Sequence, residues 1–125
     1  MESLTPNIFT KDMKASIAFY KLLGFKISMQ LPEEGDELVW ANLSNGGVNI
    51  MLQSFDSLGN DLPEVNRANG ASLLLYINVK NIRELFEQVK DKVVVLKNID
   101  VTFYGATEFS VKDSNGYVLT FAEHE

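Results

Sequence analysis

Residues 8–13 read IFTKDM, and residues 77–82 read INVKNI. A second pair of motifs repeats with nearly the same separation, because SNG occurs at residues 44–46 and again at residues 114–116. A whole structural module is therefore duplicated with almost no change in length. Two copies are too few for a solenoid, which needs about three repeats to bury its core. The duplication predicts two modules that complete each other and enclose a cavity.

The length and composition of the chain are those of one compact domain. It has 125 residues, of which 46% are hydrophobic and 22% are charged, and these values are ordinary for a globular protein. No apolar run approaches the roughly 18 residues that a membrane span needs, and the N-terminus lacks the basic and apolar regions of a signal peptide. We expect a cytoplasmic protein that does not bind membranes. Its single domain, residues 1–125, would comprise module one at 3–54, a linker at 55–70 and module two at 71–123.

Charge and cysteine content exclude several classes of function. The formal net charge is -6 and no basic run is present, which argues against a nucleic-acid partner. The acidic balance could favour a cationic ligand, although solubility is the simpler explanation. The chain has no cysteine, and disulfides, thiolate nucleophiles and zinc–thiolate sites are therefore excluded.

The sequence of the first module indicates one helix and one hairpin. Asp12 is a favourable N-cap for a helix with apolar residues at helical spacing, and Gly24 is a typical C-terminal residue. An Asn-Gly pair at residues 45–46, between two alternating runs, indicates a hairpin. The predicted strands cover residues 4–10, 25–30, 37–43 and 48–53.

The second module repeats this pattern after the linker, for which we predict a single helical turn. Asn81 is the expected N-cap of an amphipathic helix, whose apolar residues run from Ile82 to Val89 at i, i+3, i+4 and i+7. The predicted strands cover residues 72–79, 93–96, 102–111 and 117–123. Each module is thus βαβββ, and the fold class is α+β, with helices on one face of curved mixed sheets.

Two longer segments resemble a known family. Residues 16–25, SIAFYKLLGF, resemble its SxxFYxxxLGF helix, and residues 104–123, YGATEFSVKDSNGYVLTFAE, resemble its closing YGxxEFxVxDPDGYxLxFAE hairpin. Ser114 replaces the usual proline, which a type I turn tolerates. The chain thus resembles the vicinal oxygen chelate superfamily, which includes glyoxalase I, extradiol dioxygenases, fosfomycin-modifying enzymes and bleomycin-resistance proteins. The resemblance implies paired βαβββ modules, each curled around a cleft, but no single activity.

The resemblance also indicates where metal ligands would stand. In the metalloenzymes of this superfamily, a His or Gln on the first strand of a module and a Glu or His on its last strand bind the ion. The corresponding positions here are Thr5, Met51, Leu74 and Thr120, and none offers the imidazole or carboxylate that a divalent cation prefers. The single histidine, His124, is penultimate and is expected to be solvated. We therefore expect no metal and no other cofactor.

Catalytic residues are scarce as well. Without cysteine, and with His124 near the terminus, no Ser–His or Cys–His nucleophile pair is available. Glu108 could act as a general base if the cleft desolvates it, although it could equally point outward from its strand or pair with a lysine. These residues favour binding over catalysis. A glyoxalase-like lyase or isomerase, or a dioxygenase-related enzyme, acting on a small metabolite is the alternative, and an interaction module with a vestigial cleft is a third reading.

Strand alternation predicts a ligand-binding face. If Val39, Ala41 and Leu43 pack beneath the helix, Trp40 points to the opposite, concave side. Apolar and aromatic side chains interrupted by a few amides are typical of a small-molecule site, although a dry core or a dimer interface could have the same composition. The predicted ligand-binding residues are Asn7, Phe9, Trp40, Asn42, Asn49, Met51, Leu74, Tyr76, Asn78 and Thr120.

These observations predict a metal-independent protein that binds a small organic molecule, nearest in character to the bleomycin-resistance type. Such a protein captures its ligand reversibly, as in drug sequestration, and changes no bond. The resemblance further implies a homodimer, because a second chain often completes the cleft in relatives of this size.

Overall fold

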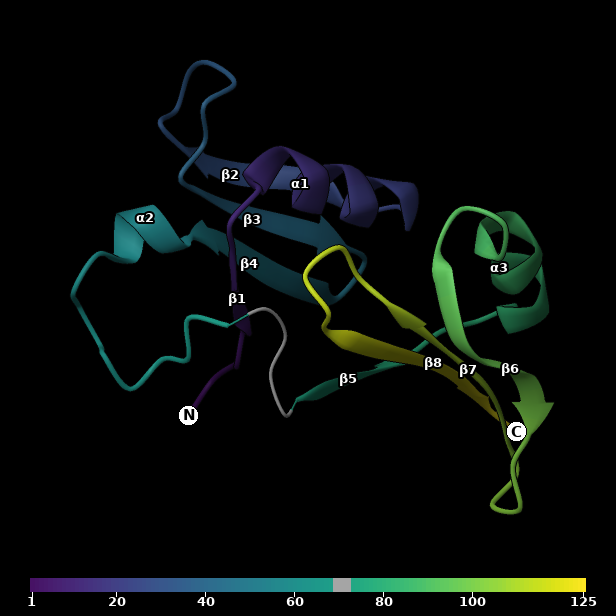
Figure 1. Cartoon of the computed structure of the whole chain (residues 1–125). Coiled ribbons are helices and arrows are strands. Elements are labelled where there is room, and N and C mark those ends of the chain that lie inside the picture. Colours follow the sequence, from purple (N-terminus) through teal and green to yellow (C-terminus); the bar gives the residue numbers. More distant parts are fainter. Residues whose placement is uncertain (69–72) are drawn as a thin grey trace. The chain divides into compact units, whose positions relative to one another are not determined.

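The computed structural model describes residues 1–68 and 73–125. The chain divides into two compact units, Met1–Arg67 (unit 1) and Ala68–Glu125 (unit 2). Each unit contains one four-stranded sheet, with strand order β1-β4-β3-β2 in unit 1 and β5-β8-β7-β6 in unit 2 (Figure 1). In both sheets the first strand runs parallel to the last, and the other pairs are antiparallel. The predicted α+β class with two similar modules is therefore confirmed.

The elements follow the same order in the two units, except for a short extra helix at the end of unit 1. Those of unit 1 are β1 (Asn7–Thr10), α1 (Met13–Leu22), β2 (Lys26–Leu31), β3 (Trp40–Asn45), β4 (Val48–Ser54) and α2 (Phe55–Leu58). Those of unit 2 are β5 (Leu74–Asn78), α3 (Ile82–Val89), β6 (Val94–Val101), β7 (Ala106–Lys112) and β8 (Val118–His124). No helix in the described part of the chain is long and apolar enough to cross a membrane.

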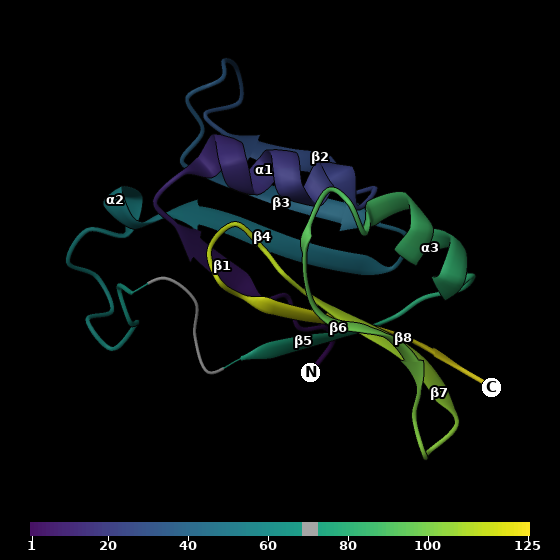
Figure 2. The same cartoon turned by 45° about the vertical axis from the view of Figure 1, so that its right-hand side comes forward.

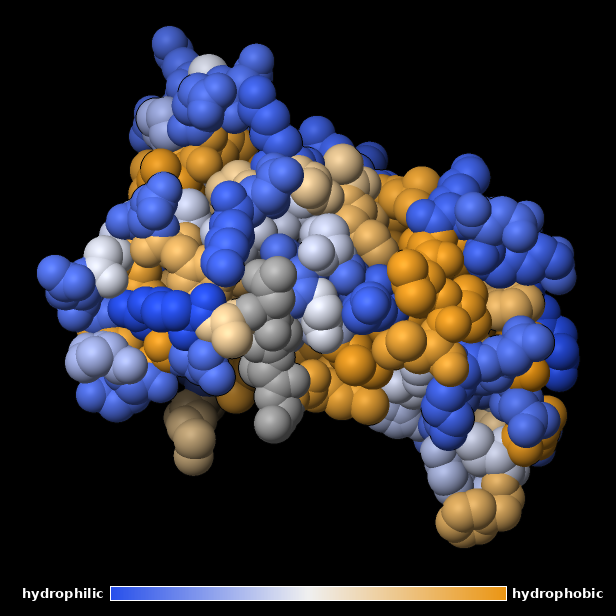
Figure 3. Space-filling model, in the orientation of Figure 1, coloured by the Kyte–Doolittle hydropathy of each residue, from blue (hydrophilic) through white to orange (hydrophobic). Residues whose placement is uncertain are grey.

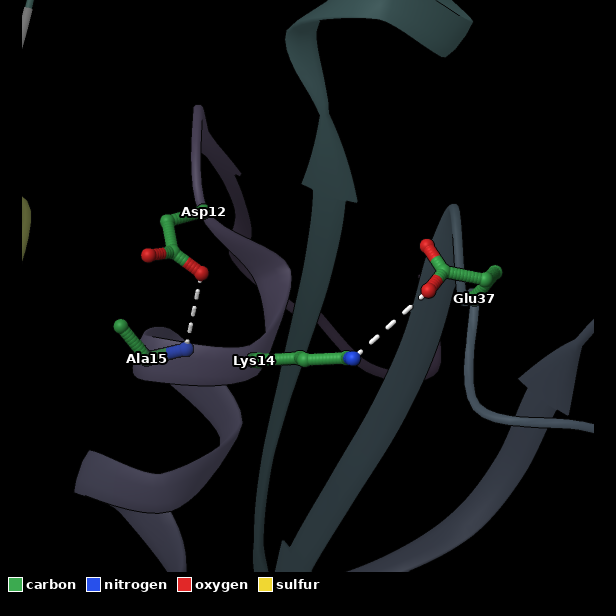
Figure 4. A network of polar contacts seen from close by, with 4 residues as sticks. All are labelled: Asp12, Lys14, Ala15 and Glu37. Atoms are coloured by element: carbon green, nitrogen blue, oxygen red, sulfur yellow. Dashed lines mark hydrogen bonds and ion pairs between the residues drawn. The ribbon is translucent and has the colours of Figure 1, made fainter.

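Helix α1 begins where the sequence predicts. The Oδ1 atom of Asp12 accepts a hydrogen bond from the backbone N–H of Ala15 at 3.1 Å (Figure 4), which satisfies one of the free donors of the first turn. Beside this cap, Lys14 Nζ lies 3.6 Å from a carboxylate oxygen of Glu37, and both side chains are exposed. The helix ends at Leu22, and Gly24, two residues later, has φ of 95°, which glycine readily adopts.

The buried face of the unit 1 sheet lies under α1, as both ribbon views show (Figure 2). Tyr20 of the helix is fully buried and packs edge-on against Phe25 at 5.6 Å between ring centroids. On the strands, Ala41 and Leu43 are fully buried, as predicted. Val39 was predicted to join them but is 41% exposed, and it lies just before the first residue of β3.

The start of α3 differs from the prediction. The side chain of Asn81 makes no capping hydrogen bond, and its backbone is left-handed with φ of 58°. An N-cap side chain reaches the first turn from an extended backbone, and Asn81 therefore cannot cap in this conformation. Its place is taken by Glu123 of β8, whose carboxylate accepts hydrogen bonds from the N–H groups of Asn81 at 3.0 Å and Ile82 at 3.1 Å.

The β6–β7 hairpin also corrects the prediction. A single strand was expected over residues 102–111, whereas β6 runs on to Val101 and β7 starts at Ala106. Thr102 closes the turn, because its hydroxyl accepts from the Ala106 N–H at 3.0 Å, and Gly105 has φ of 82°, which an L side chain rarely adopts. Phe103 in this turn is 99% exposed. Figure 3 shows the apolar surface at the hairpin tip, at the lower right.

Candidate ligand-binding faces

The face of the unit 1 sheet opposite α1 carries the side chains that were predicted to contact a ligand. Strand register places Asn7, Met51 and Asn42 in one row across β1, β4 and β3. The next row consists of Phe9, Gln53 and Trp40. Side chains of directly paired residues lie on the same side of a sheet, and the structure therefore brings the predicted residues of unit 1 together on one face.

Most of the amides on this face are engaged with one another. Asn42 Nδ2 donates to Ser28 Oγ at 2.7 Å and to Asn49 Oδ1 at 3.2 Å. Ser44 Oγ donates to the same Asn49 oxygen at 2.6 Å. In a second pair, Asn7 Nδ2 donates to Gln53 Oε1 at 2.9 Å, whereas the buried Asn7 Oδ1 has no partner among the described residues. These residues form a polar border in which the amide nitrogens of Asn7 and Asn42 are engaged by neighbouring side chains.

Trp40 lies at the edge of an open hollow of about 590 Å³. The volume falls within the range of roughly 300–1,000 Å³ that is usual for small-molecule sites. Its lining combines apolar and polar side chains, namely Met29, Gln30, Leu31, Glu33, Val39, Trp40, Gln53 and Ser57. Several of these apolar side chains are exposed in spite of their size. Apolar side chains with two amides, a hydroxyl and a carboxylate beside them can hold a flat organic group and orient its polar atoms.

The corresponding face of unit 2 carries Leu74, Tyr76 and Asn78 on β5, all of them exposed. Thr120 lies beside Tyr76 in the β5–β8 register, but it is buried, and its hydroxyl lies 2.8 Å from that of Ser110. Thr120 is thus bonded within the sheet, whereas the other three predicted residues of this unit are accessible to solvent.

A group of titratable side chains surrounds Glu108 on β7. The hydroxyls of Tyr76 and Tyr104 both donate to Glu108 Oε2, the latter at 2.7 Å. His124 Nε2 lies 3.1 Å from the Tyr76 hydroxyl, and the two rings meet edge to face with centroids 6.1 Å apart. His124 was expected to be a solvated tail residue; it is exposed, but it belongs to β8 and contacts Tyr76.

The electrostatics of this group bear on catalysis. The pKa of Glu108 is lowered mainly by the hydrogen bond from Tyr76. The hydrogen bond from Tyr104 and the charges of His124 and Lys97 lower it further, whereas desolvation raises it. The same hydrogen bond to Glu108 raises the pKa of Tyr76 to about 12. A general base is most effective when its pKa lies near the operating pH. Glu108 is therefore an ionised carboxylate at neutral pH and a weak base.

The residues at the expected metal positions do not fit a divalent cation. Leu74 offers only hydrocarbon, Met51 a thioether, and the hydroxyl of Thr120 is engaged with Ser110. Thr5, before β1, offers a neutral hydroxyl, which is a weak ligand for a divalent cation. Within residues 1–68 and 73–125, no three His, Asp or Glu side chains come together in a way that could hold an ion.

Comparisons with known proteins agree with this architecture. Among the solved structures that are similar over the full length of this chain are a protein from Micromonospora and two proteins connected with bleomycin. TioX from Micromonospora sp. ML1 has a TM-score of 0.79 at 17% identity, with 100% of both chains covered. A bleomycin resistance determinant encoded on the transposon Tn5 has a TM-score of 0.68 at 20% identity, with 100% of this chain and 99% of that chain covered. A bleomycin-binding protein complexed with bleomycin has a TM-score of 0.66 at 20% identity, with 100% of both chains covered.

At these identities the structural similarity shows the fold alone. No protein of curated function matches the chain. The sequence profile of the Glyoxalase/Bleomycin resistance protein/Dioxygenase superfamily matches residues 4–121, nearly the whole chain. The protein therefore belongs to the glyoxalase/bleomycin resistance protein/dioxygenase superfamily.

Proposed function

We propose that the protein binds a small organic molecule reversibly, without a metal ion, on the face of unit 1 that carries Trp40. The observation that supports this most directly is the hollow beside Trp40, whose lining combines apolar side chains with polar ones. The apolar residues are Met29, Leu31 and Val39, and the polar ones are Gln30, Glu33, Gln53 and Ser57. Exposed apolar side chains that gather in one place usually mark a contact site, and a concave apolar surface with few polar groups suits a small ligand.

The polar border of this face would restrict the ligand in position. Because Asn42, Ser44 and Asn49 hold one another by hydrogen bonds, their side chains are ordered before a ligand arrives, and less conformational entropy is lost on binding. Asn7 Oδ1 is the exception, since it is buried and has no donor among the described residues.

The chemistry of the chain favours binding over catalysis. The lowered pKa of Glu108 makes this carboxylate a poor proton acceptor, and the four expected metal positions lack suitable ligands. One similar structure is a bleomycin-binding protein complexed with bleomycin, which makes capture of a drug of that kind the specific form of our proposal.

The experiment uses the single tryptophan of the chain. Bleomycin, and then a panel of flat organic compounds, is titrated into the protein while the emission of Trp40 is recorded. Stacking on an aromatic ring contributes ~0.5–1.5 kcal/mol beyond area burial, and we expect Trp40→Ala to weaken binding, followed by calorimetry, about two- to tenfold. Phe103→Ala, which removes an aromatic ring that is 99% exposed, is the matched control and should leave binding unchanged.

Two results would contradict the proposal. Wild-type emission that ignores bleomycin and every compound of the panel would mean that this face takes no such ligand. Loss of the fold in Trp40→Ala would identify Trp40 as a core residue, whose half-buried ring supports the sheet.

We also propose that the protein is a homodimer. Strands β2 and β6 lie at the edges of their sheets, and an edge strand presents unpaired N–H and C=O groups to any partner. On β6, Val94 and Leu96 are large apolar side chains that are exposed. Sedimentation velocity at micromolar concentration should give the mass of two chains, and a monomer would contradict this assembly.

A further inference from the structure

Unit 2 holds a carboxylate whose position is fixed from two sides. Glu108 projects from β7, and its Oε2 atom accepts hydrogen bonds from Tyr76 of β5 and from Tyr104 of the β6–β7 turn. Two phenols on one oxygen restrict the carboxylate more than a single flexible partner would, and such charge-assisted bonds are stronger than neutral ones.

The second oxygen of this carboxylate is free. Both tyrosines donate to Oε2, and no described residue donates to Oε1 of Glu108. Neither ion pair found among the described residues involves Glu108 either. Among the described residues, Glu108 Oε1 is therefore an ionised, oriented acceptor without a hydrogen-bond partner.

The surroundings of Glu108 favour a positive charge. Asp100 of β6 lies directly opposite Glu108 in the strand register, and like charges in such a pair destabilise a sheet. Both carboxylates line an open hollow of about 380 Å³ between β6 and β7, where Lys97 is the only cationic residue among the described lining residues. Two carboxylates against one ammonium leave the lining of this hollow with a net negative charge, which a bound cation would neutralise. Outside the lining, the charge of His124, which contacts Tyr76, also acts on Glu108.

The aromatic rings of Tyr76 and Tyr104 lie beside the same carboxylate. Tyr76 is 43% exposed and Tyr104 is 53% exposed, although both hydroxyls are bound to Glu108. The carbon atoms of both rings are thus accessible to solvent, while their hydroxyl groups are bound to Glu108. Ring faces attract cations and also contact apolar groups.

From this arrangement we infer that the Tyr76–Glu108–Tyr104 group binds the ammonium group of a small organic amine. The ammonium donates a hydrogen bond to the free Oε1 of Glu108, and its organic part contacts the exposed rings of Tyr76 and Tyr104. No bond is made or broken. The site lies wholly within unit 2 and does not depend on the ligand proposed for Trp40, and either proposal can fail without the other.

The test compares three probes of similar shape on the full chain. They are 2-phenylethylammonium, the neutral 2-phenylethanol and the anion phenylacetate, and binding is followed by changes in the amide ¹H–¹⁵N spectrum. The ammonium should bind saturably and shift the resonances of Glu108 and of its neighbours on β7 and in the β6–β7 turn. Loss of a hydrogen bond to a charged group should weaken binding about tenfold or more, and the alcohol should be weaker than the ammonium by at least that factor.

A pair of matched variants assigns the effect to one carboxylate. Glu108→Gln keeps the side-chain shape and removes the charge, and it should weaken the binding of 2-phenylethylammonium about tenfold or more. Glu84→Gln makes the same charge change at an exposed position on α3 of the same unit and should change the affinity less than about twofold.

Three outcomes would overturn the inference: equal affinity for the ammonium and the alcohol, equal effects of Glu108→Gln and Glu84→Gln, or no saturable binding of the ammonium. The comparison of probes needs no variant, and it stays decisive if Glu108→Gln fails to fold.

Discussion

The buried hydroxyl pair of Ser110 and Thr120 allows a quantitative test of how the unit 2 sheet is held together. The two residues lie opposite each other on β7 and β8, are 6% and 8% exposed, and have their hydroxyl oxygens 2.8 Å apart. Thr120→Val keeps the shape of the side chain but removes one hydroxyl, and Ser110 is then buried without a partner. A buried polar group left unsatisfied costs about 1–3 kcal/mol, and the free energy of unfolding should fall by that amount.

The double variant gives the opposite expectation. When Ser110→Ala and Thr120→Val are combined, neither hydroxyl remains to be desolvated, and replacing both partners of a buried bond by apolar groups can be nearly neutral. The double variant should therefore be more stable than the sum of the two single losses predicts, with a coupling of about 0.5–3 kcal/mol.

Urea unfolding of the four proteins at 25 °C, followed by circular dichroism, measures this coupling. Thr107→Val, at a half-exposed position on β7, is the matched control and should change stability by less than about 0.5 kcal/mol. If the losses of the two single variants add to within about 0.5 kcal/mol, the hydroxyls are independent and the reasoning is refuted. Thermal unfolding offers a second reading, since 1 kcal/mol corresponds to roughly 3–6 °C in a chain of this size.

Three further predictions concern the helix ends and the metal positions. Asp12→Ala should lower the free energy of unfolding by about 1 kcal/mol through loss of the α1 cap, whereas Lys14→Ala, at an exposed 3.6 Å ion pair, should change it by about 0–0.5 kcal/mol; equal losses in urea unfolding would contradict the cap. Hydrogen bonds from the backbone of Ile82 and Asn81 lower the pKa of Glu123 below the usual 4.5. The folded-state pKa is then below the unfolded one, and the stabilisation is present above the unfolded value and lost as the pH falls through the folded value. In Glu123→Gln, the free energy of unfolding should fall less steeply below about pH 4.5 than in the wild type. The same pH dependence in both proteins would refute the capping role. Finally, elemental analysis of the purified protein should find no stoichiometric zinc, nickel, manganese or iron, and one equivalent of any of them, removable together with an activity, would oppose metal-independent binding.

The sequence alone was sufficient for the features that depend on local chemistry. Strand alternation identified Ala41 and Leu43 as buried and Trp40 as facing the other way, because side chains alternate with period two along any strand. Asp12 could be recognised as a cap, since it bonds a backbone N–H only three residues away. The duplication of residues 8–13 in residues 77–82 likewise predicted two sheets of the same design, because similar local patterns form similar elements.

Tertiary structure alone decided which distant side chains meet. Glu123 caps α3 from 41 residues away along the chain. The residues around Asn81 gave no sign that its backbone would be left-handed, or that a residue of another strand would cap the helix in its place. Glu108 binds the hydroxyl of Tyr76 across 32 residues, and His124 reaches the same hydroxyl across 48. These contacts arise because β8 pairs in parallel with β5 and antiparallel with β7. Strand order and register are set by the packing of the whole sheet, and alternation within a single strand carries no information about them.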